Sequence, residues 1–301
     1  MPAATRQRPD CLIIGAAKAG TTTLFNVLAA HPEVAPSREK ETRFYSHDER
    51  YANGPDWYGS EFFAGSAPGA VRMEATPAYL TWSEKVAPRI RQAYPDDGVS
   101  LVVILRDPVS RAYSHYCHRV RLGHETLSFA DAIDMEESLL RVHWDELSRT
   151  GNGKHGYLRA SCYASRLRPF IDHFDRRRIL FLLQDDLQAD RFGHAMARLL
   201  AFMQVDYSVA LKPARLNTPT RARHASLARA YWRLKRTAAR TIYTTVVPNA
   251  VRRRVLPLLF PAAAYPPLDP VLAQELRLRL ADEVRATQDL IGRDLTGWLP
   301  A

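Results

Sequence analysis

The stretch CLIIGAAKAGTTTLFNVLAA, residues 11–30, is the part of the sequence that decides the fold. Its apolar residues 12–14 predict a short buried strand, its glycine, alanine and threonine residues predict a tight loop, and residues 24–30 predict a helix. Small residues let backbone N–H groups approach an anion closely, and the positive end of the helix dipole points at the same place. We call residues 15–23 the glycine loop and predict that it binds an anion, although a ligand-free turn between strand and helix fits the same residues.

The glycine loop differs from the usual nucleoside-triphosphate loop, in which a lysine directly follows the second glycine. Gly15 and Gly20 keep the spacing, but Lys18 precedes Gly20 and Thr21 takes the lysine position. Triphosphate chemistry commonly needs Mg²⁺ to neutralise charge, whereas a sulfuryl group carries less charge and would need only a lysine. The residues expected to bind the anion are Lys18, Ala19, Gly20, Thr21, Thr22 and Thr23.

Strand and helix patterns alternate along the rest of the chain. LVVIL at residues 101–105 and ILFLL at residues 179–183 predict strands buried on both faces. Helical patterns follow at residues 108–121, 157–174, 190–203 and 272–291, the last with Leu276, Leu280, Val284 and Ile291 on one face. This order predicts an α/β fold, P-loop-like, with three layers and a central, mostly parallel sheet flanked by helices. We expect a single domain over residues 1–301 with a basic cap or insertion at about residues 212–268.

A second candidate anion site follows the strand at residues 101–105. Arg106 comes directly after this strand, and Ser114 lies about two turns along the next helix, on the side of Ser110 and Arg111. An arginine and a hydroxyl can together hold one phosphate, and ligands of parallel sheets bind at the carboxyl ends of strands. Because an arginine stands where an acidic metal ligand would be expected, we predict no metal.

The two motifs together resemble those of the PAPS-dependent sulfotransferases (PAPS is 3′-phosphoadenosine 5′-phosphosulfate). The glycine loop resembles the 5′-phosphosulfate loop of that family, and Arg106 with Ser114 resembles its 3′-phosphate motif. Residues 40–45 (KETRFY), 74–79 (EATPAY), 162–167 (CYASRL) and 290–298 are similar to segments of the heparan sulfate sulfotransferase branch and its bacterial relatives. The resemblance implies an enzyme that uses PAPS, releases PAP (3′-phosphoadenosine 5′-phosphate), needs no metal and places Tyr163 near the nucleotide.

The resemblance also assigns roles to individual residues. Glu41 matches the family's catalytic glutamate and would act as general base, while Lys18 would stabilise charge on the leaving phosphate. Arg43 and Glu74 would bind or orient the acceptor, or orient Glu41. Alternatives remain: Glu41 could be only a salt-bridge partner of its basic neighbours, and the base could be a histidine, with His47 ahead of His115, His118 and His124.

Three departures from the family pattern concern the acceptor and the nucleotide. Ala75 stands where a lysine is usual and Arg43 where a histidine is usual. The cysteine-bracketed Lys-Gly loop of the animal enzymes is absent, and residues 217–223, with Arg221 and Arg223, are the candidates to hold the nucleotide instead.

Composition limits the partners. The 42 Lys and Arg residues outnumber the 32 Asp and Glu residues, and the resulting charge of +10 favours an anionic partner. The arginine-rich residues 221–254 could bind the nucleotide, an anionic acceptor or a membrane surface, or form a solvated helix face. Three scattered cysteines and the lack of a long apolar run predict a cytoplasmic protein without disulfides.

The sequence leaves two rival functions open. A P-loop kinase would bind ATP with Mg²⁺, and a non-enzymatic nucleic-acid binder would use the basic charge, although no nucleic-acid-reading motif is present and we expect no such partner. The acceptor could be a carbohydrate, a glycolipid or a small natural product, sulfated on a hydroxyl or an amine. The sequence leaves the oligomeric state open.

Overall fold

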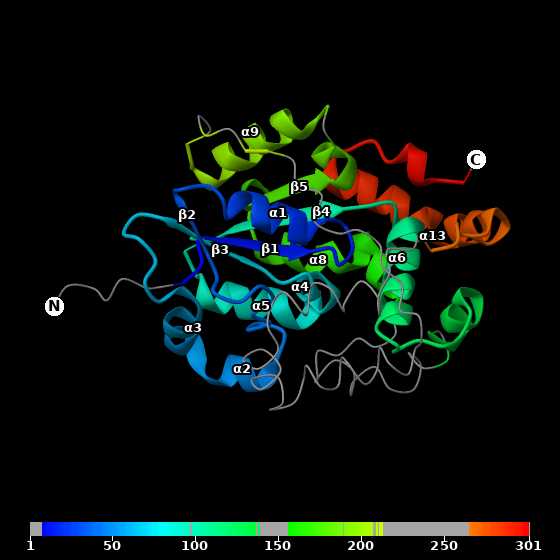
Figure 1. Ribbon diagram of the computed structural model, residues 1–301, viewed down its shortest axis with the longest axis horizontal. Helices are drawn as coiled ribbons and strands as arrows, with labels where there is room; N and C mark the ends of the chain where they lie inside the picture. Colours follow the sequence, from blue (N-terminus) through cyan, green and yellow to red (C-terminus); the bar gives the residue numbers. More distant parts are fainter. Residues whose placement is uncertain are drawn as a thin grey trace, which may run out of the picture.

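The computed structural model describes residues 8–96, 98–136, 138, 156–188, 190–206, 209, 211–212 and 265–300. Its centre is a parallel sheet of five strands in the order β2-β3-β1-β4-β5 (Figure 1). The strands are β1 (Cys11–Gly15), β2 (Val34–Pro36), β3 (Val71–Ala75), β4 (Ser100–Leu105) and β5 (Ile179–Leu183). Strands β1 and β4 are buried along their whole length, because they lie inside the sheet and helices cover both of its faces.

The direction in which the chain crosses from one strand to the next decides which face of the sheet the connecting helix covers. From β1 the chain crosses to β2 on one side, whereas β3 to β4 and β4 to β5 cross in the opposite direction. Since parallel crossovers are right-handed, α1 (Thr21–Leu28) lies on one face, and α5 (Ser83–Ala93) and α8 (Tyr163–His173) pack together on the other. The short helix α4 (Ala78–Thr81) packs on β1 within the second layer, and α9 (Phe192–Met203) packs against β5.

The remaining described elements are short or lie outside these layers. They are α2 (Asp48–Ala52), α3 (Gly54–Phe63), α6 (Pro108–Arg121) and α13 (Pro270–Ile291), with 3₁₀ turns η1 (Arg159–Ser161), η2 (Arg176–Arg178), η3 (Gln184–Leu187) and η4 (Thr296–Trp298). None of the helices described is long and apolar enough to cross a membrane.

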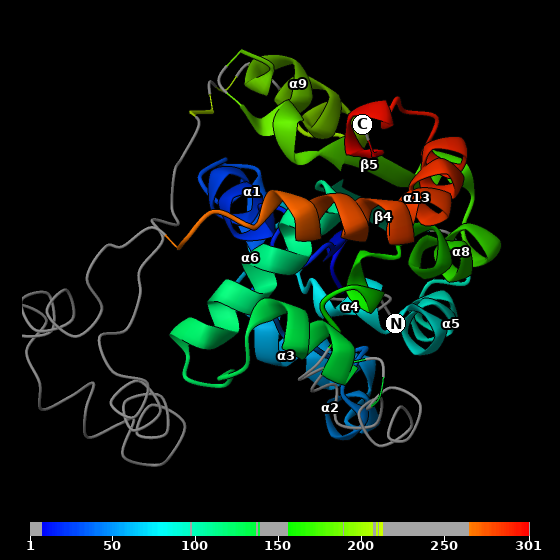
Figure 2. The same cartoon turned by 90° about the vertical axis from the view of Figure 1, so that its right-hand side faces the viewer.

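Helices α6 and α13 pack against each other beside the sheet (Figure 2). Each begins with an aspartate cap and a proline: Asp107 accepts a hydrogen bond from Ser110 N at 2.6 Å, and Asp269 accepts one from Val271 N at 2.9 Å. These caps satisfy helix-terminal N–H groups that would otherwise lack partners. Arg277 of α13 also lies 3.6 Å from the Asp107 carboxylate.

The expected apolar face of the C-terminal helix is confirmed. Leu276, Leu280, Val284 and Ile291 are all buried. The first two pack with Val109 of α6 in a cluster separate from the main core, whereas the last two join the main core around the sheet. Helix α13 is therefore part of the same packed unit as the sheet.

The strands expected at residues 101–105 and 179–183 are confirmed, as are the helices after them. The helix expected over residues 157–174 is wrong in its first part. Residues 159–161 form a 3₁₀ turn, and the non-helical ψ of 76° at Cys162 separates this turn from α8. Strands β2 and β3 were not predicted, because β2 has three residues and β3 (VRMEA) carries two charges. The cap expected at residues 212–268 lies almost wholly outside the described residues.

Candidate functional site

The glycine loop joins β1 to α1. No side chain caps the start of α1 and no acidic residue lies in its first turn, so the positive end of the helix dipole is not neutralised locally. Gly20 has φ +107°, a conformation that other residues rarely adopt. Gly15 has a different constraint, since a Cβ atom there would lie 2.5 Å from Leu80 Cβ of α4. Both glycines are therefore required by the local geometry.

Two arginines from the β4–α6 segment hold the backbone of the glycine loop. Arg106 Nη1 donates to the carbonyl oxygen of Lys18 at 3.2 Å, and Arg111 Nη1 donates to that of Ala17 at 3.4 Å. Arg111 is completely buried and also donates to Ser161 Oγ at 2.7 Å and to the carbonyl oxygen of Tyr157. A buried guanidinium needs such acceptors, because an unpaired charge inside a protein is costly. Sequence reasoning placed Arg111 on the relevant helix face but missed this supporting role.

The same region concentrates positive charge. Burial, followed by repulsion from Arg121, Arg106 and Arg111, lowers the pKa of Lys18 to about 8. Burial and the neighbouring Lys18 lower the pKa of His118 to about 3. Within the described part of the chain, no carboxylate lies within ion-pair distance of Lys18 or Arg106. A lysine and an arginine that lie close together and form no ion pair with a described carboxylate are suited to an anion.

The other residues expected at the nucleotide have different positions. Ser114 lies half-buried on α6, one turn beyond Ser110. Tyr163 is buried, and its hydroxyl donates to the carbonyl oxygen of Arg106 at 2.8 Å. Burial raises the pKa of this hydroxyl, so it stays protonated as a donor. Tyr163 therefore anchors the segment that carries Arg106. Arg221 and Arg223 lie outside the described residues.

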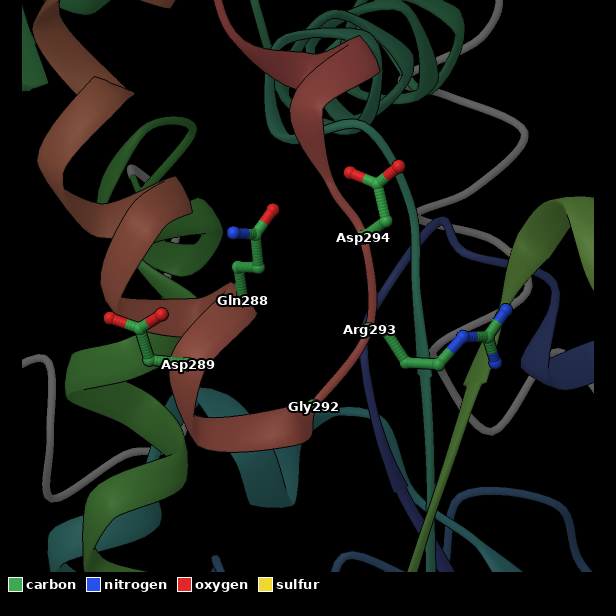
Figure 3. A pocket seen from close by; sticks show the side chains of 5 residues that line it. All are labelled: Gln288, Asp289, Gly292, Arg293 and Asp294. Atoms are coloured by element: carbon green, nitrogen blue, oxygen red, sulfur yellow. The ribbon is translucent and has the colours of Figure 1, made fainter.

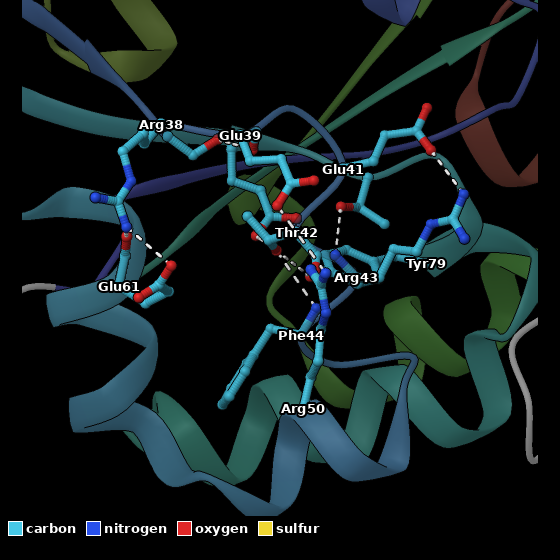
Figure 4. Close-up of polar contacts among 12 residues, drawn as sticks. Arg38, Glu39, Glu41, Thr42, Arg43, Phe44, Arg50, Glu61 and Tyr79 are labelled. Carbon is cyan, nitrogen blue, oxygen red and sulfur yellow. Dashed lines mark hydrogen bonds and ion pairs between the residues drawn. The ribbon is translucent and has the colours of Figure 1, made fainter. Parts of the chain in front are cut away.

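Glu41 lies in a loop beside the end of β3 (Figure 4). Its carboxylate is 3.2 Å from Lys40 Nζ and 3.4 Å from Arg43 Nη2, and its side chain is 37% exposed. Glu41 thus forms the ion pairs with its basic neighbours that were considered as an alternative to a catalytic role. They do not conflict with proton transfer, because the carboxylate is accessible.

Unusual backbone conformations coincide with the candidate residues. Among the described non-glycine residues, φ is positive only at Lys18 (71°), Glu41 (66°), Arg43 (54°) and Gln204 (58°). The last of these ends α9, where such a conformation is common. Strained residues persist where the surrounding structure holds them, and they cluster at functional sites.

Glu74 requires a correction to its expected contact with an acceptor. Its side chain is completely buried, and its carboxylate accepts hydrogen bonds from Thr42 Oγ1 at 2.5 Å and from the Tyr58 hydroxyl. Burial raises the pKa of Glu74, and the hydroxyl donors, Thr42 first, oppose that rise. With no exposed surface, Glu74 does not contact an acceptor in this structure, and its other expected role, orienting Glu41, stays a prediction.

The histidines considered as alternative bases are placed differently from one another. His47 precedes α2, and its backbone N–H donates to the carbonyl oxygen of Arg43 at 3.0 Å. His115 stacks edge-on against Tyr157 at 5.2 Å, and burial holds its pKa well below the usual range. His124 follows α6, and its carbonyl oxygen accepts a hydrogen bond from Arg119. Of the histidines, His47 lies nearest in sequence to the Glu41 loop.

A shallow hollow at the end of α13 is distinct from these groups. It is lined by Gln288, Asp289, Gly292, Arg293 and Asp294 (Figure 3). Arg293 turns to Asp186 and makes two hydrogen bonds of 2.9 and 3.0 Å to its carboxylate. Because this cation is already paired, the hollow is less suited to an anion than the Lys18 region. Within the described residues, no group of three or more His, Cys, Asp or Glu side chains is placed to hold a metal.

Comparisons with known proteins agree with this geometry. The family model of the sulfotransferase domain matches residues 8–222 of this chain. Heparan sulfate glucosamine 3-O-sulfotransferase 3B1 of Mus musculus is 30% identical over 193 residues, which are 64% of this chain and 45% of that protein. Heparan sulfate glucosamine 3-O-sulfotransferase 5 of Mus musculus is 36% identical over 169 residues, 56% of this chain and 46% of that protein. The chain thus spans about half the length of these curated relatives.

One solved structure supports the fold over nearly the whole chain. A sulfotransferase from Alicyclobacillus acidocaldarius superposes with a TM-score of 0.68 at 24% identity, covering 97% of this chain and 98% of that one. This likeness confirms the expected α/β architecture.

Proposed function

The chain belongs to the sulfotransferase family, and from this membership we propose that it transfers the sulfuryl group of PAPS to a hydroxyl or amine of an acceptor. The observation that carries the proposal is the assembly of Lys18, Arg106 and Arg111 around the glycine loop, where no carboxylate of the described residues forms an ion pair with Lys18 or Arg106. A donor with anionic groups at both ends fits such a site better than a neutral ligand does.

The two anion-binding motifs lie at neighbouring strand ends. The glycine loop follows β1 and Arg106 follows β4, and these strands pair in parallel with Gly15 opposite Val103. The loop would hold the 5′-phosphosulfate through its N–H groups and threonine hydroxyls, while Arg106 and Ser114 would hold the 3′-phosphate. This arrangement supports PAPS over a donor that carries sulfate alone.

The proposed reaction is an in-line displacement at sulfur. The acceptor oxygen or nitrogen forms a bond to sulfur, the bond from sulfur to the phosphate oxygen breaks, and PAP leaves with that electron pair. Glu41 takes the proton that the acceptor loses. Lys18 stabilises the negative charge that develops on the leaving phosphate. Such electrostatic stabilisation is stronger where water is excluded.

The acceptor we propose to test first is a carbohydrate hydroxyl, because the curated relatives are named for sulfation of glucosamine in heparan sulfate. The Arg43 side chain is 47% exposed beside Glu41 and can contact an acceptor. Glycolipids and small natural products are the further classes to screen.

Labelled sulfate transfer from PAPS to a panel of these acceptors tests the proposal. Glu41→Gln should abolish turnover while PAP still binds, and Lys18→Ala should slow turnover by at least about 100-fold. Glu39→Gln is the matched control, because Glu39 is 57% exposed and lies two positions earlier. A wild-type rate in Glu41→Gln would remove Glu41 from the role of base.

A thermal-shift measurement tests the donor separately. PAP should raise the melting temperature more than ATP with Mg²⁺ or an oligonucleotide does. Stabilisation by ATP and Mg²⁺ but not by PAP would favour the kinase alternative, and stabilisation by the oligonucleotide alone would favour the nucleic-acid binder.

A further inference from the structure

We propose that the buried Glu74 is a positioning residue for Glu41 and that it acts through the hydroxyl of Thr42. This inference rests on the proposed role of Glu41 as the general base. Glu74 and Thr42 are 32 positions apart in the chain, and Thr42 Oγ1 donates to Glu74 Oε2 at 2.5 Å inside the protein.

Thr42 is the residue between two strained positions. Glu41 has φ +66° and Arg43 has φ +54°, so the backbone is left-handed on both sides of Thr42. The Thr42 hydroxyl oxygen also accepts a hydrogen bond from Phe44 N at 3.3 Å. One side chain thus fixes the turn locally and ties it to Glu74. Without such ties, residues with a Cβ leave the left-handed region, which is unfavourable for them.

The end of β3 and the residue after it hold the rest of the turn. Glu41 N donates to the carbonyl oxygen of Ala75 at 3.1 Å, and Arg43 N donates to Thr76 Oγ1 at 3.2 Å. These bonds constrain the two flanking residues, and the Thr42 side chain links the turn directly to the buried Glu74 carboxyl group. Residues 74–76 therefore accept hydrogen bonds from all three residues of the turn at 41–43 and fix its conformation.

Burial and a second hydroxyl donor hold the Glu74 side chain in place. Its side chain has no exposed surface, and the Tyr58 hydroxyl donates to the same carboxylate oxygen as Thr42 does. The Tyr58 ring stacks on Phe44 with a centroid separation of 4.2 Å, so the second donor is held in place. Both donors thus converge on Oε2, while Oε1 is buried without a hydrogen-bond partner among the described residues, so the position of the carboxyl group is set through Oε2.

Positioning matters because Glu41 itself is weakly restrained. Its side chain is partly exposed, and its two ion-pair partners, Lys40 and Arg43, belong to the same turn. The direction in which its carboxylate points depends on the backbone of the turn. A displacement of about 1 Å in a reacting group can reduce a rate about 100-fold.

The test compares Thr42→Val, which keeps the shape but lacks the hydroxyl, with Thr42→Ser, which keeps the hydroxyl. We expect Thr42→Val to lower kcat on the order of 100-fold while the Kd for PAP changes less than about threefold. Thr42→Ser should recover at least about a third of the wild-type kcat. Ser60→Ala is the control, since Ser60 is an exposed hydroxyl on α3.

A second variant keeps the proposal testable if Thr42→Val does not fold. Glu74→Gln retains an acceptor oxygen but loses the charge, and we expect it to lower kcat by about tenfold with PAP binding unchanged. Equal kcat values for Thr42→Val and Thr42→Ser would overturn the proposal, as would a parallel loss of PAP binding in Glu74→Gln. A wild-type rate in Glu41→Gln would instead refute the base assignment, so the two failures are distinguishable.

Discussion

Lys18 should take up a proton when PAP binds. Burial first, and then the positive charges of Arg121, Arg106 and Arg111, lower its pKa from 10.5 to about 8. A bound phosphate beside Lys18 supplies the missing negative charge and favours the protonated amine. The pKa should therefore return toward its ordinary value in the complex, and the affinity should depend on pH.

The size of the effect follows from these two pKa values. If binding restores the ordinary pKa, each molecule of PAP should bring in ~0.1 proton at pH 7, ~0.5 at pH 8 and ~0.9 at pH 9. The affinity should correspondingly fall by about tenfold between pH 7 and pH 9. Phosphate monoesters have a second pKa of about 6, so PAP is about 90% ionised at pH 7 and almost fully ionised at pH 8 and above. Burial and Lys18 hold the pKa of His118 at about 3 in the absence of PAP, far below this pH range.

Isothermal titration calorimetry measures this uptake directly. At pH 8, the observed enthalpy of PAP binding is plotted against the ionisation enthalpy of several non-phosphate buffers, and the slope gives the number of protons. Lys18→Met should reduce the slope to near zero. Lys85→Met is the matched control, because burial also lowers the pKa of Lys85 but this lysine pairs with Asp48. A slope near zero in the wild type, or an unchanged slope in Lys18→Met, would refute the reasoning.

Two further substitutions test the supports of the site, and a third tests the ion pair that holds the end of α13. Gly15→Ala should destabilise the fold by about 1–3 kcal/mol in denaturant titrations; Leu80→Ala should not rescue it, because the nearest atom is Leu80 Cβ at 2.5 Å. Arg111→Met should cost at least about 2 kcal/mol in urea unfolding, because buried carbonyl groups lose their donor, and should also weaken PAP binding; unchanged PAP affinity would show that the loop does not need this support. Asp186→Asn should lower the free energy of unfolding by about 1–2 kcal/mol, because Arg293 loses the carboxylate to which it donates. Arg293→Met should lower it by the same amount, and the double variant should show no additional loss.

Local patterns determined the part of the site that lies close together in the chain. The strand, the glycine loop and the first helix form within residues 11–30, and Arg106 follows its strand directly, so each could be predicted from neighbouring residues. The apolar runs of β4 and β5 likewise predicted buried strands, because a strand covered on both faces must be apolar throughout. The resemblance to the family, and with it the expectation of a PAPS donor, rested on these local motifs.

Only the tertiary structure decided how these motifs support one another. Strand β2 pairs with β3, the Glu41 N–H beyond β2 donates to the carbonyl oxygen of Ala75 at the end of β3, and Thr42 thereby comes within hydrogen-bond distance of Glu74. Packing of α6 against the glycine loop turns Arg111 into a donor for Ala17. Strand pairing and helix packing join residues distant in the chain, and the composition of a segment does not specify its partner. The sequence therefore identified which residues carry charge, whereas the fold decided which of them are buried supports and which remain accessible.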